Sequence, residues 1–168
     1  MLIAMAGLPG AGKSTLAAAL GREVGAPVLA VDAVEAAIRR AGVDPAQEFE
    51  IGLAGYAVVH AVAAELLAAR LTVVVDAVNA VEPARAGWRD LATSMGVPLR
   101  WIEVVCSDRD THRARLEQRG TRYAGLTEPT WPEVLAREVE PWEDARLVLD
   151  SVRPLDQLIP AALAHLSA

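Results

Sequence analysis

The sequence predicts an α/β fold of three layers (α/β/α), in which a parallel sheet of five strands lies between helices on both faces. Short apolar stretches alternate with segments of helical periodicity along all 168 residues, as expected where helices connect parallel strands. The stretch 71–76 contains consecutive β-branched residues without polar alternation, which is typical of a central strand buried on both faces. No repeat, low-complexity tract or linker divides the chain, so we expect 1–168 to form a single domain.

The first part of the chain contains two expected strand and helix pairs. The apolar run 2–6 predicts the first strand, and leucines at helical spacing predict a helix over 13–24, which a glycine ends. A short apolar run at 28–31 predicts the second strand. A helix over 33–41 follows, with Asp32 at the strand end also in position to cap it.

The remaining elements follow the same alternation. The polar stretch 43–50 contains a proline and is expected to be a loop, whereas apolar residues on one face predict a helix over 51–69. The helix predicted over 81–95 has a proline in its first turn and a glycine just past its end. The expected order is strand 71–76, helix 81–95, strand 99–105, helix 108–119, an exposed loop 120–130, helix 131–139, strand 146–149 and helix 155–166.

A glycine-rich loop joins the first strand to the first helix and fits the pattern G-x-x-x-x-G-K-[ST]. Its glycines allow backbone N–H groups to turn around phosphate oxygens, and the helix N-terminus adds a positive dipole end. Lys13 is expected to contact the β- and γ-phosphates of a nucleotide and Ser14 to hold Mg²⁺. The expected nucleotide-binding residues here are Gly7, Leu8, Pro9, Gly10, Ala11, Gly12, Lys13, Ser14 and Thr15.

The use of basic residues supports this interpretation of the loop. Of the 16 basic residues 15 are arginines, so Lys13 is the only lysine in the chain. A compact ammonium group on a flexible stem therefore occurs only at the position where it suits phosphate.

Two carboxylates end neighbouring strands and are expected near this loop, because the carboxyl ends of parallel strands meet at one edge of a sheet. Asp32 is expected to orient an acceptor hydroxyl and take its proton during attack on a γ-phosphoryl group; the alternative is a helix cap alone. Asp76 is expected to support Mg²⁺ together with Ser14; the alternative is a turn-forming aspartate.

Several other polar residues border the same predicted edge. Asn79 and Arg85 follow Asp76 closely and are expected to contact substrate, although both are also ordinary loop and helix-surface residues. Tyr56, on the helix 51–69, is a further candidate for the substrate cleft, with a place in the core as the alternative.

Arginines are concentrated in one helix and the loop after it. Arg115 and Arg119 are four residues apart and therefore share one helix face. We expect a lid at about 113–130 that brings both to the transferring phosphoryl group and excludes water; the alternative is a solvated face paired with nearby acids.

Composition limits the function classes. A net charge of −6 disfavours a nonspecific nucleic-acid binder, which requires a broad basic surface. We expect no membrane-spanning segment and a cytoplasmic location, because no apolar run reaches about 18 to 20 residues. The single cysteine, Cys106, cannot form an internal disulfide.

Together these residues resemble the P-loop small-molecule and polynucleotide kinases, also called AAA-domain-containing kinases, over nearly the whole chain. This group includes polynucleotide kinase, gluconate kinase, chloramphenicol phosphotransferase and zeta toxin. The resemblance implies a P-loop NTPase fold of the nucleoside-monophosphate-kinase-like type, with ATP and Mg²⁺ as cofactors. It implies that Asp32 activates the acceptor, that Asp76 is the Walker-B-type residue, and that Arg115 and Arg119 are lid arginines.

Two further residues take their expected roles from this resemblance. The stretch 147–155 resembles the family's last strand and adenine-side loop, so Arg153 is an expected nucleotide contact. Polynucleotide kinases carry an arginine one turn after the acceptor-activating aspartate, and this chain has Glu35 there. Together with the acidic net charge, Glu35 disfavours a nucleic-acid acceptor and favours a neutral or cationic small molecule.

The expected function is therefore an ATP- and Mg²⁺-dependent phosphotransferase that moves the γ-phosphoryl group of ATP to a hydroxyl of a small-molecule acceptor. One alternative is a nucleotide-binding module or slow ATPase that regulates a partner protein. The other is a polynucleotide 5′-hydroxyl kinase. Residues alone do not name the acceptor, the preference for ATP over GTP, or the oligomeric state.

Overall fold

The computed structural model of the protein describes residues 1–43 and 48–167 and confirms the three-layer α/β fold. All strand pairs are parallel, and the order across the sheet is β2-β3-β1-β4-β5. Leu2 pairs with Val73 on one side and with Leu99 on the other, so β1 is the central strand. The strands are β1 (Leu2–Ala6), β2 (Val28–Ala30), β3 (Val73–Asp76), β4 (Leu99–Val105) and β5 (Arg146–Asp150).

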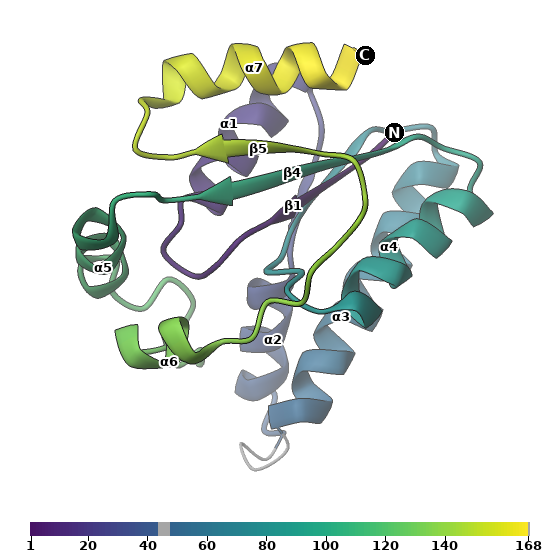
Figure 1. The fold of residues 1–168 in the computed structure, drawn as a ribbon. Helices are drawn as coiled ribbons and strands as arrows, with labels where there is room; N and C mark the ends of the chain where they lie inside the picture. The colour runs from purple at the N-terminus through teal and green to yellow at the C-terminus, as the bar shows by residue number, and fades with distance from the viewer. Residues whose placement is uncertain (44–47, 168) are drawn as a thin grey trace.

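Helices cover both faces of the sheet and one of its ends (Figure 1). One face packs against α1 (Lys13–Val24) and α7 (Leu155–Ser167). The other packs against α3 (Glu48–Ala68) and α4 (Glu82–Ser94), and α2 (Val31–Arg40) lies against α3. Two short helices lie beyond the carboxyl ends of the strands, namely α5 (Arg109–Gln118) and α6 (Trp131–Ala136).

The two hydrophobic cores follow from the alternation of side chains along β1. Leu2 and Ala4 face the core formed with α3 and α4, whereas Ile3 and Met5 face the core formed with α1 and α7. Every residue of β1 is buried, as a central parallel strand requires. The loop after β1 therefore starts from the buried centre of the sheet.

Three helix boundaries differ from the prediction by two or three residues, and β3 begins at Val73, two residues later than predicted. Helix α2 begins at Val31 after the extended Ala30, so Asp32 lies in the first helical turn and not at the cap. Helix α3 already begins at Glu48, within the predicted loop 43–50, of which 44–47 lie outside the described residues. Helix α6 stops at Ala136 because the next residue, Arg137, has extended backbone (φ −66°, ψ 121°).

The expectation that no segment is long and apolar enough to cross a membrane requires correction. The segment Glu50–Ala68 of α3 meets that criterion by length and composition. In this fold one face of the helix, including Val59 and Ala63, packs into the core, and 28% of its most apolar window is buried. One such helix is weak evidence for a membrane location, because core helices meet the same criterion.

Candidate functional site

The glycine-rich loop curves around the N-terminus of α1 at the centre of the sheet edge. Gly7, Gly10 and Gly12 all have positive φ, and Gly12 (φ 98°) is the residue that caps α1. At Gly7 a Cβ atom would lie 2.1 Å from the carbonyl oxygen of Val104, so only glycine fits there. The loop is also fixed from outside, since the imidazole Nε2 of His112 lies 2.8 Å from the carbonyl oxygen of Pro9.

Lys13 is buried at the start of α1, with 8% of its surface exposed, and its ammonium donates a hydrogen bond to the carbonyl oxygen of Leu8 (3.2 Å). Burial lowers the pKa of Lys13, and the nearby carboxylates of Asp76 and Asp32 oppose this effect. A desolvated cation with one neutral acceptor is a strong site for an anion. The structure therefore brings together the solitary lysine and both predicted carboxylates.

A cavity of about 640 Å³ lies beside this lysine, between the glycine-rich loop and α5; we call it the phosphate cavity. Arg115, Arg119 and Arg122 line it, as do Ser14 and Thr15. The positive charge and the backbone of the loop suit a polyphosphate chain. The prediction that Arg115 and Arg119 share one site agrees with this geometry.

The three arginines of this cavity differ in their contacts. Arg115 donates to the hydroxyl and carbonyl oxygens of Ser151 (2.8 and 3.0 Å), which fixes its position. Arg119 pairs with Glu128, but its Nε is buried without a partner. Arg122 lies 3.6 Å from the Asp76 carboxylate. An unpaired buried donor beside Lys13 is well suited to a phosphate oxygen.

Asp76 ends β3 with 6% of its surface exposed, and Ser14 lies half-buried one residue after Lys13. Among the described residues no three His, Cys, Asp or Glu side chains are grouped to hold a metal. Mg²⁺ characteristically takes one or two protein oxygens and completes its shell with phosphate oxygens and water. Ser14 and Asp76 fit that role if a nucleotide supplies the phosphates.

A second cavity, of about 480 Å³, opens on the other side of Lys13 between α2, α3 and the segment 126–137. Asp32, Glu35 and Tyr56 line it together with Lys13 and Arg119; we call it the acceptor cleft. Asp32 is placed there by the first turn of α2, one turn before Glu35. The structure thus joins these three predicted substrate residues to the phosphate cavity.

The polar groups along the acceptor cleft are mostly engaged with other protein groups. Glu35 pairs with Arg39 (3.6 Å). Burial raises the pKa of Tyr56 to about 12, so the phenol stays protonated, and its hydroxyl lies 3.4 Å from the amide oxygen of Asn79. By contrast, the Asp32 carboxylate makes no hydrogen bond or ion pair with any described residue, and it faces the cleft.

Asn79 and Arg85 do not line this cleft, contrary to the sequence-based expectation. Asn79, at positive φ (51°), donates to the carbonyl oxygen of Met5 (2.7 Å) and accepts from the indole of Trp88 (2.9 Å). Its side chain therefore connects the carboxyl ends of β1 and β3 to α4. Buried partners, and not substrate, satisfy its polar atoms.

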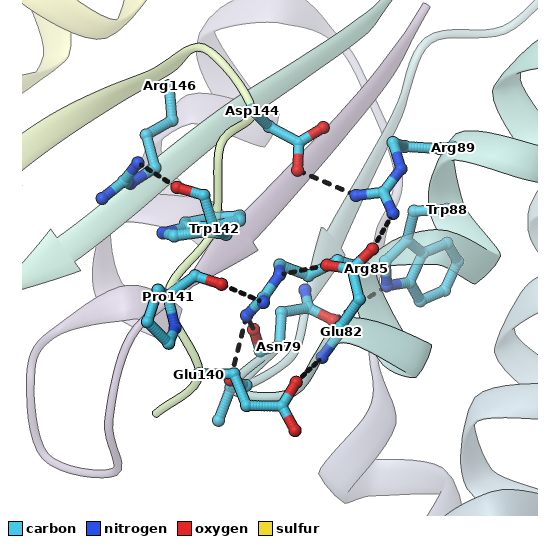
Figure 2. A network of polar contacts seen from close by, with 11 residues as sticks. Asn79, Glu82, Arg85, Trp88, Arg89, Glu140, Pro141, Trp142, Asp144 and Arg146 are labelled. Carbon is cyan, nitrogen blue, oxygen red and sulfur yellow. Dashed lines mark hydrogen bonds and ion pairs between the residues drawn. The ribbon is translucent and has the colours of Figure 1, made fainter. Parts of the chain in front are cut away.

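Arg85 is completely buried beneath the segment 137–145, which precedes β5 and which we call the strap (Figure 2). Its guanidinium donates to the carbonyl oxygens of Ala80 (2.9 Å) and Pro141 (3.1 Å), pairs with Glu82 (3.2 Å), and stacks on Trp142. Two segments distant in sequence, 79–85 and 141–142, are thereby joined. The helical position suggested a surface residue, but the strap covers it.

Replacement of Arg85 by methionine is expected to lower the free energy of unfolding by about 3 kcal/mol, because buried carbonyl oxygens lose a charged donor. Urea unfolding followed by circular dichroism measures the change. The matched variant R113M removes an exposed arginine that pairs with Glu117 and should change stability by less than about 0.5 kcal/mol. A loss below about 1 kcal/mol in R85M would contradict this role.

Arg153 is exposed on the turn between β5 and α7. It lines a third cavity, of about 330 Å³, together with Gly12, Thr15 and Arg115. This cavity shares those three residues with the phosphate cavity, so the two are adjacent. The position agrees with a contact to the nucleoside part of a bound nucleotide.

Sequence reasoning missed four residues of the site. Glu128, Glu133 and Arg137 line the acceptor cleft, and Ser151 holds Arg115. The loop residue Glu128 follows Arg119 by nine positions, which no helical or strand period connects. Only the course of the chain beyond α5 places Glu128, Glu133 and Arg137 at the cleft.

Comparison with known proteins is consistent with this geometry. A family model described as an AAA domain matches residues 2–141. No curated protein matches the sequence.

Among solved structures, a proposed kinase of Chloroflexus aurantiacus j-10-fl has a TM-score of 0.80 at 21% identity, over 98% of this chain and 97% of that chain. The APS kinase CysC of Mycobacterium tuberculosis, in complex with AMPPNP and APS, has a TM-score of 0.69 at 21% identity, over 99% and 97%.

Chaetomium thermophilum Kti12, in complex with ADP-AlF3, has a TM-score of 0.71 at 19% identity, over 98% of each chain. At these identities the likeness concerns the fold, which is that of the P-loop kinases. With the family model covering most of its length, this chain belongs to the AAA domain family.

Proposed function

We propose that the protein is an ATP- and Mg²⁺-dependent kinase that transfers the γ-phosphoryl group to a hydroxyl of a small molecule. The observation that carries this proposal is the arrangement around Lys13. A phosphate cavity rich in arginine lies on one side of the lysine, and the unpaired Asp32 carboxylate faces the acceptor cleft on the other. A nucleotide-binding protein without an acceptor has no need of the second cavity.

The roles of the side chains follow from their positions. Bound Mg·ATP supplies the transferable phosphoryl group and a metal charge, with Ser14 and Asp76 as the residues suited to hold the metal. Asp32 accepts the proton of the acceptor hydroxyl and directs that oxygen toward the phosphate cavity. Lys13 and Arg119, which line both cavities, neutralise charge between them.

We also propose that residues of about 113–130 act as the lid. Arg119 pairs with Glu128 and Arg122 lies near Asp76, so the lid arginines contact carboxylates at the site. Phosphate and metal would compete for these same groups. Closure would then exclude water from the transferring group.

The proposal is tested by acceptor-stimulated release of ADP. The purified protein is incubated with Mg·ATP and panels of sugars, hydroxy acids, nucleosides, aminoglycosides, chloramphenicol-like alcohols and 5′-hydroxyl oligonucleotides. We expect at least one small hydroxyl compound to raise turnover tenfold or more and to carry the labelled phosphate. Transfer to oligonucleotides alone would favour the polynucleotide kinase alternative.

The regulatory alternative predicts a different result in the same assay. A nucleotide-dependent module would hydrolyse Mg·ATP at a rate that no acceptor changes, and its nucleotide state would alter binding to a partner protein. The absence of stimulation across the whole panel would therefore overturn the kinase proposal.

A further inference from the structure

One charged side chain of the acceptor cleft is not used by the proposed reaction. Arg137 follows α6 at its C-terminus, where extended backbone ends the helix and directs the residue to the cleft. Its guanidinium makes no hydrogen bond or ion pair with any residue that the structure describes. It does not line the phosphate cavity, which already contains three arginines.

Arg137 lines the same cleft as Lys13 and Tyr56, and its charge acts on both side chains. Burial and the charge of Arg119 lower the pKa of Lys13, and Arg137 contributes to the same effect. Arg137 also acts on the Tyr56 hydroxyl across the cleft, as the smallest of the influences there. The guanidinium is therefore within electrostatic range of the site where a hydroxyl near Asp32 would react.

The carboxylates of the acceptor cleft other than Asp32 are already engaged. Glu133, one helical turn earlier, accepts hydrogen bonds from the backbone N–H and the hydroxyl of Thr130 (2.7 Å each). Glu128 pairs with Arg119, and Glu35 pairs with Arg39. Of the described residues that line the cleft, a bound molecule thus meets one unpaired carboxylate, Asp32, and one unpaired guanidinium, Arg137.

We propose that the acceptor is a hydroxy acid, whose hydroxyl is held by Asp32 and whose carboxylate is bound by Arg137. This inference rests on the proposed kinase function and deepens it. The planar guanidinium matches a carboxylate through two parallel hydrogen bonds. The other carboxylates lining the cleft disfavour a dianion such as a phosphate ester, so a single negative charge fits best. The expectation of a neutral or cationic acceptor, which Glu35 suggested, is thereby revised.

The first test compares acceptors that differ only in charge. Polyhydroxy acids are assayed for ADP release beside their primary amides, the corresponding neutral polyols, and phosphorylated polyols. We expect a hydroxy acid to have a kcat/KM at least thirtyfold above its amide. Preference for the neutral or phosphorylated compounds would overturn the inference but leave the kinase proposal standing. No stimulation by any compound would overturn the kinase proposal itself.

The second test removes the guanidinium. We expect R137A to raise the KM for the hydroxy acid about thirtyfold, with kcat and the KM for ATP changed less than threefold. Thirtyfold corresponds to about 2 kcal/mol, which is typical of a charged hydrogen bond. R22A, which removes an exposed arginine from the last turn of α1, is the matched control and should behave as wild type.

A binding measurement separates recognition from turnover. Calorimetric titration of the hydroxy acid into the protein saturated with a nonhydrolysable ATP analogue should show the same thirtyfold loss in R137A, with the amide binding equally to both proteins. R137K should recover only part of the affinity, because lysine lacks the planar fork. If R137A instead weakens nucleotide binding and leaves the hydroxy acid unaffected, Arg137 serves the phosphates and the inference is wrong.

Discussion

Replacement of Lys13 by alanine is expected to weaken binding of Mg·ATP about a thousandfold. The ammonium is buried with the carbonyl oxygen of Leu8 as its only hydrogen-bond partner among the described residues, so most of its interaction with a polyphosphate is available for binding. Two charge-assisted hydrogen bonds to phosphate are worth about 4 kcal/mol in all, which corresponds to about three powers of ten. Isothermal titration with a nonhydrolysable ATP analogue measures the loss.

A change at another cation of the same helix serves as the control. R22A removes an exposed arginine from the last turn of α1 and should leave nucleotide affinity within about twofold of wild type. Circular dichroism should show that K13A remains folded, since the substitution removes a desolvated charge. Affinity of K13A within tenfold of wild type would mean that the nucleotide is held elsewhere.

Replacement of Asp32 by asparagine is expected to reduce kcat about a thousandfold and to leave the affinity for Mg·ATP within threefold of wild type. Asparagine keeps the size of the side chain but cannot accept the proton of an acceptor hydroxyl, and general base catalysis typically contributes a factor of about 10² to 10⁴. Steady-state ADP release and direct titration of nucleotide measure the two quantities separately.

The matched control for this variant is D156N. Asp156 is an exposed acid in the first turn of α7, so it has a helical position similar to that of Asp32 but lies on the opposite face of the sheet. The turnover of D156N should equal that of wild type. Unchanged turnover in D32N would show that another group activates the acceptor, and a proportional loss of nucleotide affinity would show that Asp32 acts on binding instead.

The nucleotide side of the site was predictable because its residues are close together in the sequence. Gly7 to Thr15 form one continuous segment, and the glycine positions prescribe its backbone. Asp76 was predictable for a related reason, since a run of valines identifies the strand and the residue after it must lie at the carboxyl edge. In both cases a local pattern determines the position.

The acceptor side was predicted only in part. Asp32 and Tyr56 reach the cleft as expected, but Asn79 and Arg85, also expected there, are buried in the network that joins β1, α4 and the strap before β5. Arg137 was not identified at all. The sequence spacing of Asn79 and Arg85 from Asp76 indicated proximity along the chain, whereas side-chain direction depended on which later segment covered them.

By itself the sequence determined the order of strands and helices, the glycine-rich loop and the edge of the sheet at which the carboxylates gather. These features depend on periodicity and backbone preference over a few residues. The tertiary structure alone decided which polar side chains remain without a partner among the described residues, as Asp32 and Arg137 do, and which are satisfied, as Arg85 is. The reason is physical: burial and pairing depend on contacts between segments 50 or more residues apart, such as Arg85 with Pro141, and these contacts exist only once the chain has folded.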